Sequence, residues 1–204
     1  MNARPMLLAA LIAVTACTGG ERVVESTGTE PPVETTDAET ASDPVGDAVA
    51  ALLEAESYAF DASVALTVSN ERVDTDLEGW VDGDARELVV RSGDESVITR
   101  VVAGVATVER NGERIEIPVT EAGGAPSLTI LSDIENLVET STSEFRGSLT
   151  AEALRGSGFN DSTPVTITIT LAADGQLAGY SLASSDGAWS AIVTFDGIGE
   201  SYTS

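Results

Sequence analysis

The chain carries few residues of the kinds that do covalent chemistry. Its 204 residues include one cysteine, Cys17, and no histidine. Without histidine, no Ser-His-Asp or Cys-His arrangement can form, and the commonest metal ligand is missing as well. Paired carboxylates of the kind that glycosidases use are conceivable among 34 acidic residues, but aromatic platforms for a sugar are scarce, at 4% of the chain. We therefore expect a protein that is not an enzyme and that holds no cofactor.

Cys17 follows a short segment of the export type. Arg4 supplies a positive charge, Met6 to Val14 form an apolar run, and small residues lead up to the cysteine. The run is too short for a transmembrane helix, which needs about 20 apolar residues. Because Cys17 is the only cysteine, no disulfide can form within the chain. The fold must therefore rest on its apolar core.

Val14-Thr15-Ala16-Cys17 resembles the lipobox of bacterial lipoproteins. The resemblance implies that residues 1–16 are a lipoprotein signal peptide, that cleavage falls before Cys17, and that Cys17 becomes the point of lipid attachment, with palmitate among the acyl groups. The protein would then be anchored in the cell membrane on its extracytoplasmic side. The alternative is an incidental cysteine in a plain secretory signal.

One acidic motif invites comparison with a calcium site. Asp74-x-Asp76-x-Glu78-Gly79 has the spacing that opens an EF-hand loop. The position of the bidentate glutamate is taken by Ala85, and no flanking helices are predicted. Acids that alternate along the outer face of a strand explain the motif better, so we expect no metal site here.

The charge of the chain excludes one class of partner. The formal net charge is -24, the isoelectric point is about 4.1, and all ten basic residues are arginine. Such a polyanion repels nucleic acids and anionic lipid headgroups. We expect no nucleic-acid partner, and we expect the lipid on Cys17, not a basic patch, to provide membrane attachment.

The chain divides into three parts. After the signal peptide, residues 17–43 are the lipid-bearing cysteine and an acidic tether rich in Thr, Glu, Ser and Pro, with little that could pack. Order is predicted to begin at Asp43 and Pro44, a helix cap and a first helical residue. Residues 44–204 are therefore predicted to form one domain.

Hydrophobic periodicity predicts an α+β domain. A helix should run from Pro44 to about Glu56, and a strand from Ser57 to Ser69. Short connections such as Asn111-Gly112 predict an antiparallel meander. The further strands expected lie near residues 73–81, 87–91, 96–102, 105–110, 114–119, 143–149, 165–171, 176–183 and 189–195, with a helix over 127–138 and a helical turn over 150–154.

Several segments resemble the LolA/LppX-type carriers, and most of all the actinobacterial LppX/LprG lipoproteins. In the first half, they are Leu52-Leu53, which lead into the long strand, and the Gly-Gly-Pro break before the helix expected over 127–138. In the second half, they are Phe145-Arg146-Gly147-Ser148-Leu149 and the run from Pro164 to Ile169, which continues through Asp174-Gly175-Gln176-Leu177. The resemblance implies a strongly curved antiparallel half-barrel of about ten strands, with two to three helices packed on its concave face.

The resemblance also implies a function. Such carriers hold acyl chains in an apolar cavity between sheet and helices, so the expected partners are the membrane, an acylated lipid or glycolipid, and as a further candidate an envelope transporter. The residues expected to line the cavity are Phe60, Val64, Leu66, Leu77, Ile130, Leu131, Ile134, Ile167 and Ile169. Alternating apolar stripes are also typical of a closed core. The alternative is therefore a non-carrier envelope lipoprotein with a filled core that binds a protein partner.

Overall fold

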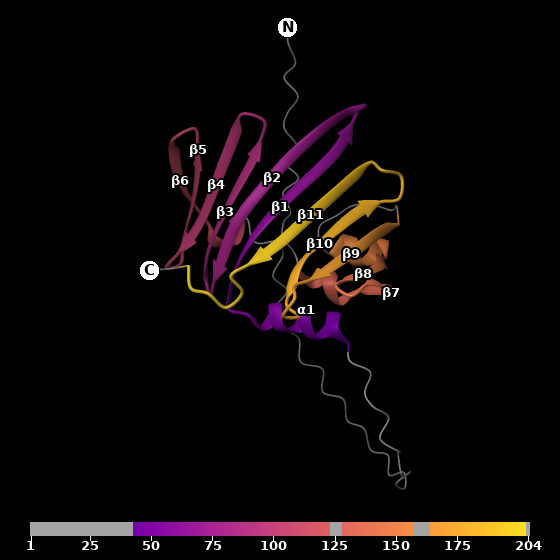
Figure 1. Ribbon diagram of the computed structural model, residues 1–204. Coiled ribbons are helices and arrows are strands. Elements are labelled where there is room, and N and C mark those ends of the chain that lie inside the picture. Colours follow the sequence, from indigo (N-terminus) through magenta and orange to yellow (C-terminus); the bar gives the residue numbers. More distant parts are fainter. Residues whose placement is uncertain (1–42, 123–127, 157–163, 203–204) are drawn as a thin grey trace, which may run out of the picture.

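The computed structural model describes residues 43–122, 128–156 and 164–202 (Figure 1). The predicted signal peptide, Cys17 and most of the tether lie outside these residues, as do Gly123 and Gly124 of the Gly-Gly-Pro break.

The domain begins with the predicted helix, α1 (Pro44–Glu54). Asp43 caps it, because its Oδ1 accepts a hydrogen bond of 2.9 Å from the backbone N–H of Gly46. Pro44 occupies the first turn, where its missing N–H costs nothing. One face of the helix is buried through Val45, Ala48, Val49 and Leu52. The predicted start and cap of this helix are confirmed, and the helix ends at Glu54, two residues earlier than predicted.

Six strands follow as an antiparallel meander, and every connection between them has two residues. The strands are β1 (Ser57–Val68), β2 (Glu71–Asp82), β3 (Ala85–Ser92), β4 (Glu95–Val102), β5 (Val105–Arg110) and β6 (Glu113–Ile117). Positive φ angles at Asn111 and Gly112 allow the type of tight turn that matches strand twist. The turns thereby fix the register of the whole meander.

The described residues of the second half of the chain form two short 3-10 helices, one further α-helix and five strands. They are η1 (Val119–Glu121), η2 (Leu128–Ser132), β7 (Ile134–Ser141), β8 (Glu144–Leu149), α2 (Ala151–Gly156), β9 (Val165–Leu171), β10 (Leu177–Ser184) and β11 (Trp189–Asp196). Among the described residues, neither α-helix has the length and hydropathy that a membrane span requires.

The helix predicted over residues 127–138 is wrong. Within it, the described residues form η2 and the start of β7. Asn136 has φ +54°, and the β7–β8 register shifts at the same place. This bulge resets the alternation of the strand, so Ile134 and Leu137 both pack against the core although they are three residues apart. A bulged strand has therefore reproduced the spacing of a helix.

The strands form one antiparallel sheet in the order β6-β5-β4-β3-β2-β1-β11-β10-β9-β8-β7. The first and last strands of the chain meet at its centre, where Phe60 of β1 pairs with Phe195 of β11. The two edges are β6 and β7, and α1 lies across one end of the sheet (Figure 1). The sheet curves without closing, which confirms the predicted α+β half-barrel with helices on its concave face; it has eleven strands instead of about ten.

The main core cluster lies in one half of this half-barrel, whereas Val89, Val101 and Ala106 are buried on β3–β5 outside that cluster. The main cluster combines α1, η2, α2 and the concave side of β1 and β8–β11. α1 contacts β9, β10 and η2, and α2 contacts η2. Among the described residues, the extensive helix–sheet contacts thus fall on β9 and β10. We call this part the closed half, and β2–β6 the open arm.

Candidate functional site

The concave face of the sheet is the surface on which the predicted ligand residues lie. Residues paired directly across an antiparallel sheet share a face. Phe60 pairs with Gly79, and Gly79 with Leu88, so these positions lie on one side together with the core. We call this side the inner face and the opposite side the outer face.

Five of the nine predicted ligand residues are fully buried in the closed half: Phe60, Ile130, Leu131, Ile167 and Ile169, none more than 5% exposed. The other four, Val64, Leu66, Leu77 and Ile134, are half-buried and pack against the same cluster. The structure therefore brings all nine together. The five buried residues are packed against other side chains, and three of the remaining four lie where the closed half meets the open arm.

The open arm carries a second apolar surface on the inner face, which continues from those residues. Leu77 pairs with Val90, and Val90 with Val97. In the next row, Leu88 and Val108 both pair with Thr99. We call this surface the open apolar strip; it consists of seven half-buried residues, Val64, Leu66, Leu77, Leu88, Val90, Val97 and Val108.

Sequence reasoning missed Leu88, Val90 and Val97 because apolar residues follow one another on both faces there, in Leu88-Val89-Val90 and Val97-Ile98, and it missed Val108 on β5 as well. Val89 points outward from β3 between two inward neighbours, and it is nevertheless buried, at 7% exposure. Alternation alone cannot assign a face there. The two-residue turns could have done so, because they propagate the pairing of Phe60 strand by strand to Val108.

The strip has the dimensions of an acyl chain. Neighbouring strands lie about 4.8 Å apart, so the four steps from β1 to β5 cover about 19 Å. One leaflet of a bilayer is about 15 Å of hydrocarbon. Gly79 lies among these residues and has no side chain that would project from the surface. A Cβ on Gly79 would lie 2.9 Å from Cζ of Phe60 and would also collide with the backbone oxygen of Glu87.

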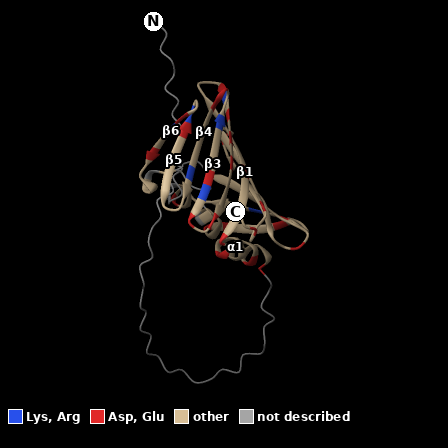
Figure 2. Cartoon of the chain, turned by 90° about the vertical axis from the view of Figure 1, so that its left-hand side faces the viewer, with Lys and Arg blue, Asp and Glu red and all other residues tan. Residues whose placement is uncertain are grey.

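Charged residues of the open arm lie mainly on its outer face, as the register places Glu87, Arg91 and Arg100 there. Figure 2 shows acidic and basic residues along these strands. Arg100 pairs with Glu87, and Arg91 with Glu78. The hydrogen bond from Arg91 lowers the pKa of the Glu78 carboxyl, and this carboxyl stays ionised at neutral pH.

The acids of the EF-hand-like motif are engaged with other side chains. Asp74 accepts from Arg72 at 2.8 Å, Asp76 accepts from the hydroxyl of Ser63 at 2.8 Å, and Glu78 pairs with Arg91. In residues 43–122, 128–156 and 164–202, no three acidic side chains are grouped as metal ligands. β2 presents these acids along its outer face as a solvated, partly paired row.

Two tyrosines lie at the base of the inner face. Tyr58 and Tyr180 both contact Phe195, with ring centroids 5.9 Å and 6.1 Å apart. Burial raises the pKa of Tyr58 to about 12, and it raises the pKa of Tyr180 further. Both phenols are neutral at physiological pH and add no charge to the inner face.

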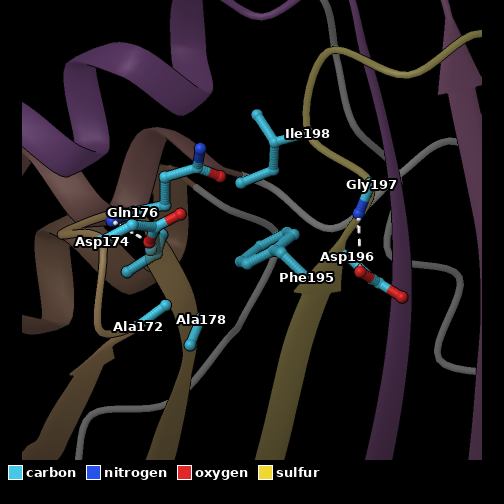
Figure 3. Close-up of a pocket in the computed structure, with 9 residues that line it drawn as sticks. Ala172, Asp174, Gln176, Ala178, Phe195, Asp196, Gly197 and Ile198 are labelled. Atoms are coloured by element: carbon cyan, nitrogen blue, oxygen red, sulfur yellow. Dashed lines mark hydrogen bonds between the residues drawn. The ribbon is translucent and has the colours of Figure 1, made fainter.

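A separate pocket of about 210 Å³ lies at the end of the β9–β10 hairpin (Figure 3). Phe195, Leu177 and Ile198 contribute its apolar lining, and Asp174, Gln176 and Asp196 are its polar residues. Its volume is below the roughly 300–1,000 Å³ of typical ligand pockets. The Asp174 carboxylate already accepts from the N–H of Gln176, and that of Asp196 from the N–H of Gly197. None of the predicted ligand residues lines it.

Comparison with solved structures places this architecture among known folds. The Mycobacterium tuberculosis lipoprotein LppX is 17% identical to the chain, with a TM-score of 0.50 over 78% of this chain and 95% of LppX. The chain has the LolA/LppX-type fold. LprF from Mycobacterium bovis is 13% identical, with a TM-score of 0.49 over 78% of this chain and 93% of LprF. A LolA superfamily protein from Nitrosomonas europaea is 9% identical, with a TM-score of 0.34 over 82% and 96% of the two chains.

The likeness concerns the fold alone, because sequence identities of 9–17% support no conclusion beyond the fold. No protein-family model matches the sequence, and a search of curated proteins finds no matching relative. The predicted LolA/LppX-type fold is confirmed. What the inner face of this LolA/LppX-type half-barrel binds has to be argued from its own residues.

Proposed function

We propose that this protein is a membrane-anchored envelope lipoprotein that binds an acylated lipid or glycolipid, without catalysis, on the inner face of its half-barrel. The observation that carries the proposal is the open apolar strip. A half-buried apolar surface on the concave wall of a sheet, continuous with a packed core, is the kind of surface that binding sites present. A hydrocarbon chain matches it in length and polarity.

The mechanism follows from burial of apolar surface. Each methylene that leaves water for the strip contributes about 0.8 kcal/mol, so a long acyl chain supplies ample binding energy before ordering costs. The closed half acts as a rigid support, because Ile167 and Ile169 are fully buried there. The half-buried Val90 and Val97 of the open arm provide the contact surface. No proton transfer or charge is required.

The lipid anchor and the tether would keep this surface within reach of a membrane. The 26 residues from Thr18 to Asp43 would span about 30 Å as a coil and up to about 90 Å when stretched. Because the domain is strongly acidic, it would not adhere to anionic headgroups by itself. A bound lipid would come from the membrane or from an envelope transporter, and the protein would hold it on the extracytoplasmic side.

The test uses two neighbouring residues of β4 that face opposite sides of the sheet. Val97 is half-buried on the inner face, and Ile98 is half-buried on the outer face. A Cys17→Ser chain, which cannot be acylated, is purified from a bacterial envelope, and its bound lipids are identified by mass spectrometry. We expect acylated lipid with this chain and with Ile98→Gln, and a loss of most of it with Val97→Gln. The proposal fails if no acyl lipid co-purifies, or if both variants retain or lose it equally.

One observation favours a second candidate, a lipoprotein with a filled core that acts through a protein partner. Five of the nine predicted ligand residues are buried in the packed cluster of the closed half. If the open apolar strip instead covers a partner protein, the Cys17→Ser chain carries no lipid. Val97→Gln then abolishes co-purification of that partner while Ile98→Gln preserves it.

A further inference from the structure

The outer edge of β6 has no strand beside it among the described residues (Figure 1). This strand is five residues long, Glu113-Arg114-Ile115-Glu116-Ile117. Ile115 at its centre is 60% exposed. An unpaired strand edge offers a row of backbone donors and acceptors to another chain, and natural proteins usually block such edges with short strands, charged side chains, proline or bulges.

Two residues of β6 direct both their backbone N–H and their backbone C=O toward this edge. Arg110 and Glu113 flank the two-residue turn of the β5–β6 hairpin and pair with each other. In such a hairpin the flanking residues form a hydrogen-bonded pair, and hydrogen-bonded and non-hydrogen-bonded pairs then alternate. Glu113, Ile115 and Ile117 therefore direct their backbone groups toward β5. Arg114 and Glu116 direct theirs outward.

The side chains of this edge are complementary to themselves. If a second copy of β6 pairs antiparallel about Ile115, Arg114 of each copy lies opposite Glu116 of the other. These are the two residues with outward backbone groups, so each opposed pair is also a hydrogen-bonded pair. Ile115 faces its own counterpart in a non-hydrogen-bonded pair, where side chains approach most closely. Charge, hydrogen bonding and apolar contact thus agree on one register.

The contacts within the chain leave this pairing available. Arg114 donates from Nη2 to the Thr107 hydroxyl at 3.2 Å, and its guanidinium has further N–H donors. Glu116 is exposed and forms no ion pair with any described residue. In a chain with a net charge of -24, β6 contributes only two acids against one arginine. Repulsion between copies is therefore weak at this edge.

The opposite edge of the sheet lacks these properties. β7 carries Glu135 and Glu139 and no basic residue, so two copies would oppose like charges. Its ladder to β8 is also bulged at Asn136. Self-pairing is thus specified at β6 and disfavoured at β7.

We propose that β6 is the contact strand of a two-fold dimer, in which a second copy of this chain pairs with it antiparallel about Ile115. The two sheets then form one continuous sheet. The two-fold axis of such a pair runs perpendicular to the sheet, so both inner faces lie on the same side and the two open apolar strips form opposite walls of one trough. The pairing rests on β6 alone and does not require lipid binding. An edge of five residues buries less than a stable interface of about 1,200–2,000 Å², so the association is weak and is best trapped covalently.

A single engineered cysteine tests this register. In the full-length Cys17→Ser chain, Ile115→Cys introduces the only thiol. Across a non-hydrogen-bonded pair the Cα atoms are about 4.5 Å apart, within the 4.4–6.8 Å range of disulfides. We expect mild oxidation to convert most of the protein to a disulfide-linked dimer. The matched control is Val138→Cys on β7, because Val138 is 58% exposed, nearly as much as Ile115. It should stay monomeric.

Charge reversal separates specific pairing from random collision. In the Ile115→Cys chain, Glu116→Arg places arginine opposite arginine, and Arg114→Glu places acid opposite acid. Each should slow cross-linking by about fivefold or more, and the double swap should restore the rate to within about twofold. Circular dichroism confirms that each variant is folded. Equal rates for single and double variants, or equally fast cross-linking of Val138→Cys, would overturn the dimer. Lipid content measured on the same variants reports on the proposed function separately.

Discussion

Replacement of Ile167 tests whether the closed half is a packed core or an empty ligand cavity. Ile167 lies on the inner face of β9 and is 0% exposed. Ile192, on β11, is the same residue type in the same sheet, but it faces outward and is 56% exposed. The variants Ile167→Ala and Ile192→Ala therefore remove the same atoms from opposite sides of one sheet.

The expected difference is large. A fully buried Ile→Ala change costs about 2–5 kcal/mol, because it removes buried carbons and leaves a cavity. Surface substitutions usually stay within about 0.5 kcal/mol. At about 2–4 °C for each kcal/mol, Ile167→Ala should lower the melting temperature by roughly 5–15 °C. Ile192→Ala should lower it by no more than about 2 °C.

The assay is urea and thermal unfolding of lipid-free protein, followed by circular dichroism. The urea dependence of the unfolding free energy should be the same for both variants, since the fold is unchanged. If Ile167 lined an open cavity, its side chain would contact few other side chains, and its truncation would cost little stability. A difference of less than about 1 kcal/mol between the two variants would therefore refute the packed closed half.

Three further predictions follow from the same structure. Burial raises the pKa of Tyr58 to about 12, so the neutral phenol stabilises the fold below pH 10. This contribution, about 2 kcal/mol, is lost as pH rises from 10 to 12. Tyr58→Phe should flatten that decline when the unfolding free energy is measured by urea titration at each pH. Gly79→Ala should lower the unfolding free energy by about 1–3 kcal/mol, because its Cβ would meet Phe60 and the Glu87 backbone. Stability equal to the parent in urea unfolding would count against the close contact. Cys17→Ser should move the protein from the membrane fraction to the soluble fraction in a bacterial host, and retention in the membrane would exclude the cysteine as the anchor.

Much of the fold could be predicted from local signals. Asp43 and Pro44 marked the start of α1, and Asn111-Gly112 marked a hairpin, because caps and tight turns depend on neighbouring residues alone. The helix predicted over residues 127–138 failed for a reason that is not local. Its apolar spacing is satisfied by a bulge at Asn136, which forms only because β8 lies beside it.

The candidate site was harder to predict than the fold. Alternation identified Ile167 and Leu77 alike as inward residues. Their burial differs because α1 packs over β10 and over β9, the strand of Ile167. The position of α1 over these strands depends on the path of the whole chain. The contribution of Val90 and Val97 was hidden because each has an apolar neighbour, Val89 or Ile98, on the opposite face. A sequence pattern can thus assign a face, whereas the cover over that face is a tertiary property.

Photo-crosslinking of a bound lipid tests the central claim most directly. A phospholipid with a diazirine near the end of one acyl chain is loaded onto the Cys17→Ser chain, irradiated and digested with trypsin. Six of the ten arginines lie between residues 72 and 114, so the peptides resolve the open arm nearly strand by strand. The predicted result is acyl adducts in β2–β5, reduced by Val97→Gln and unchanged by Ile98→Gln. Adducts confined to β9 and β10, or insensitive to Val97→Gln, would contradict binding on the open apolar strip.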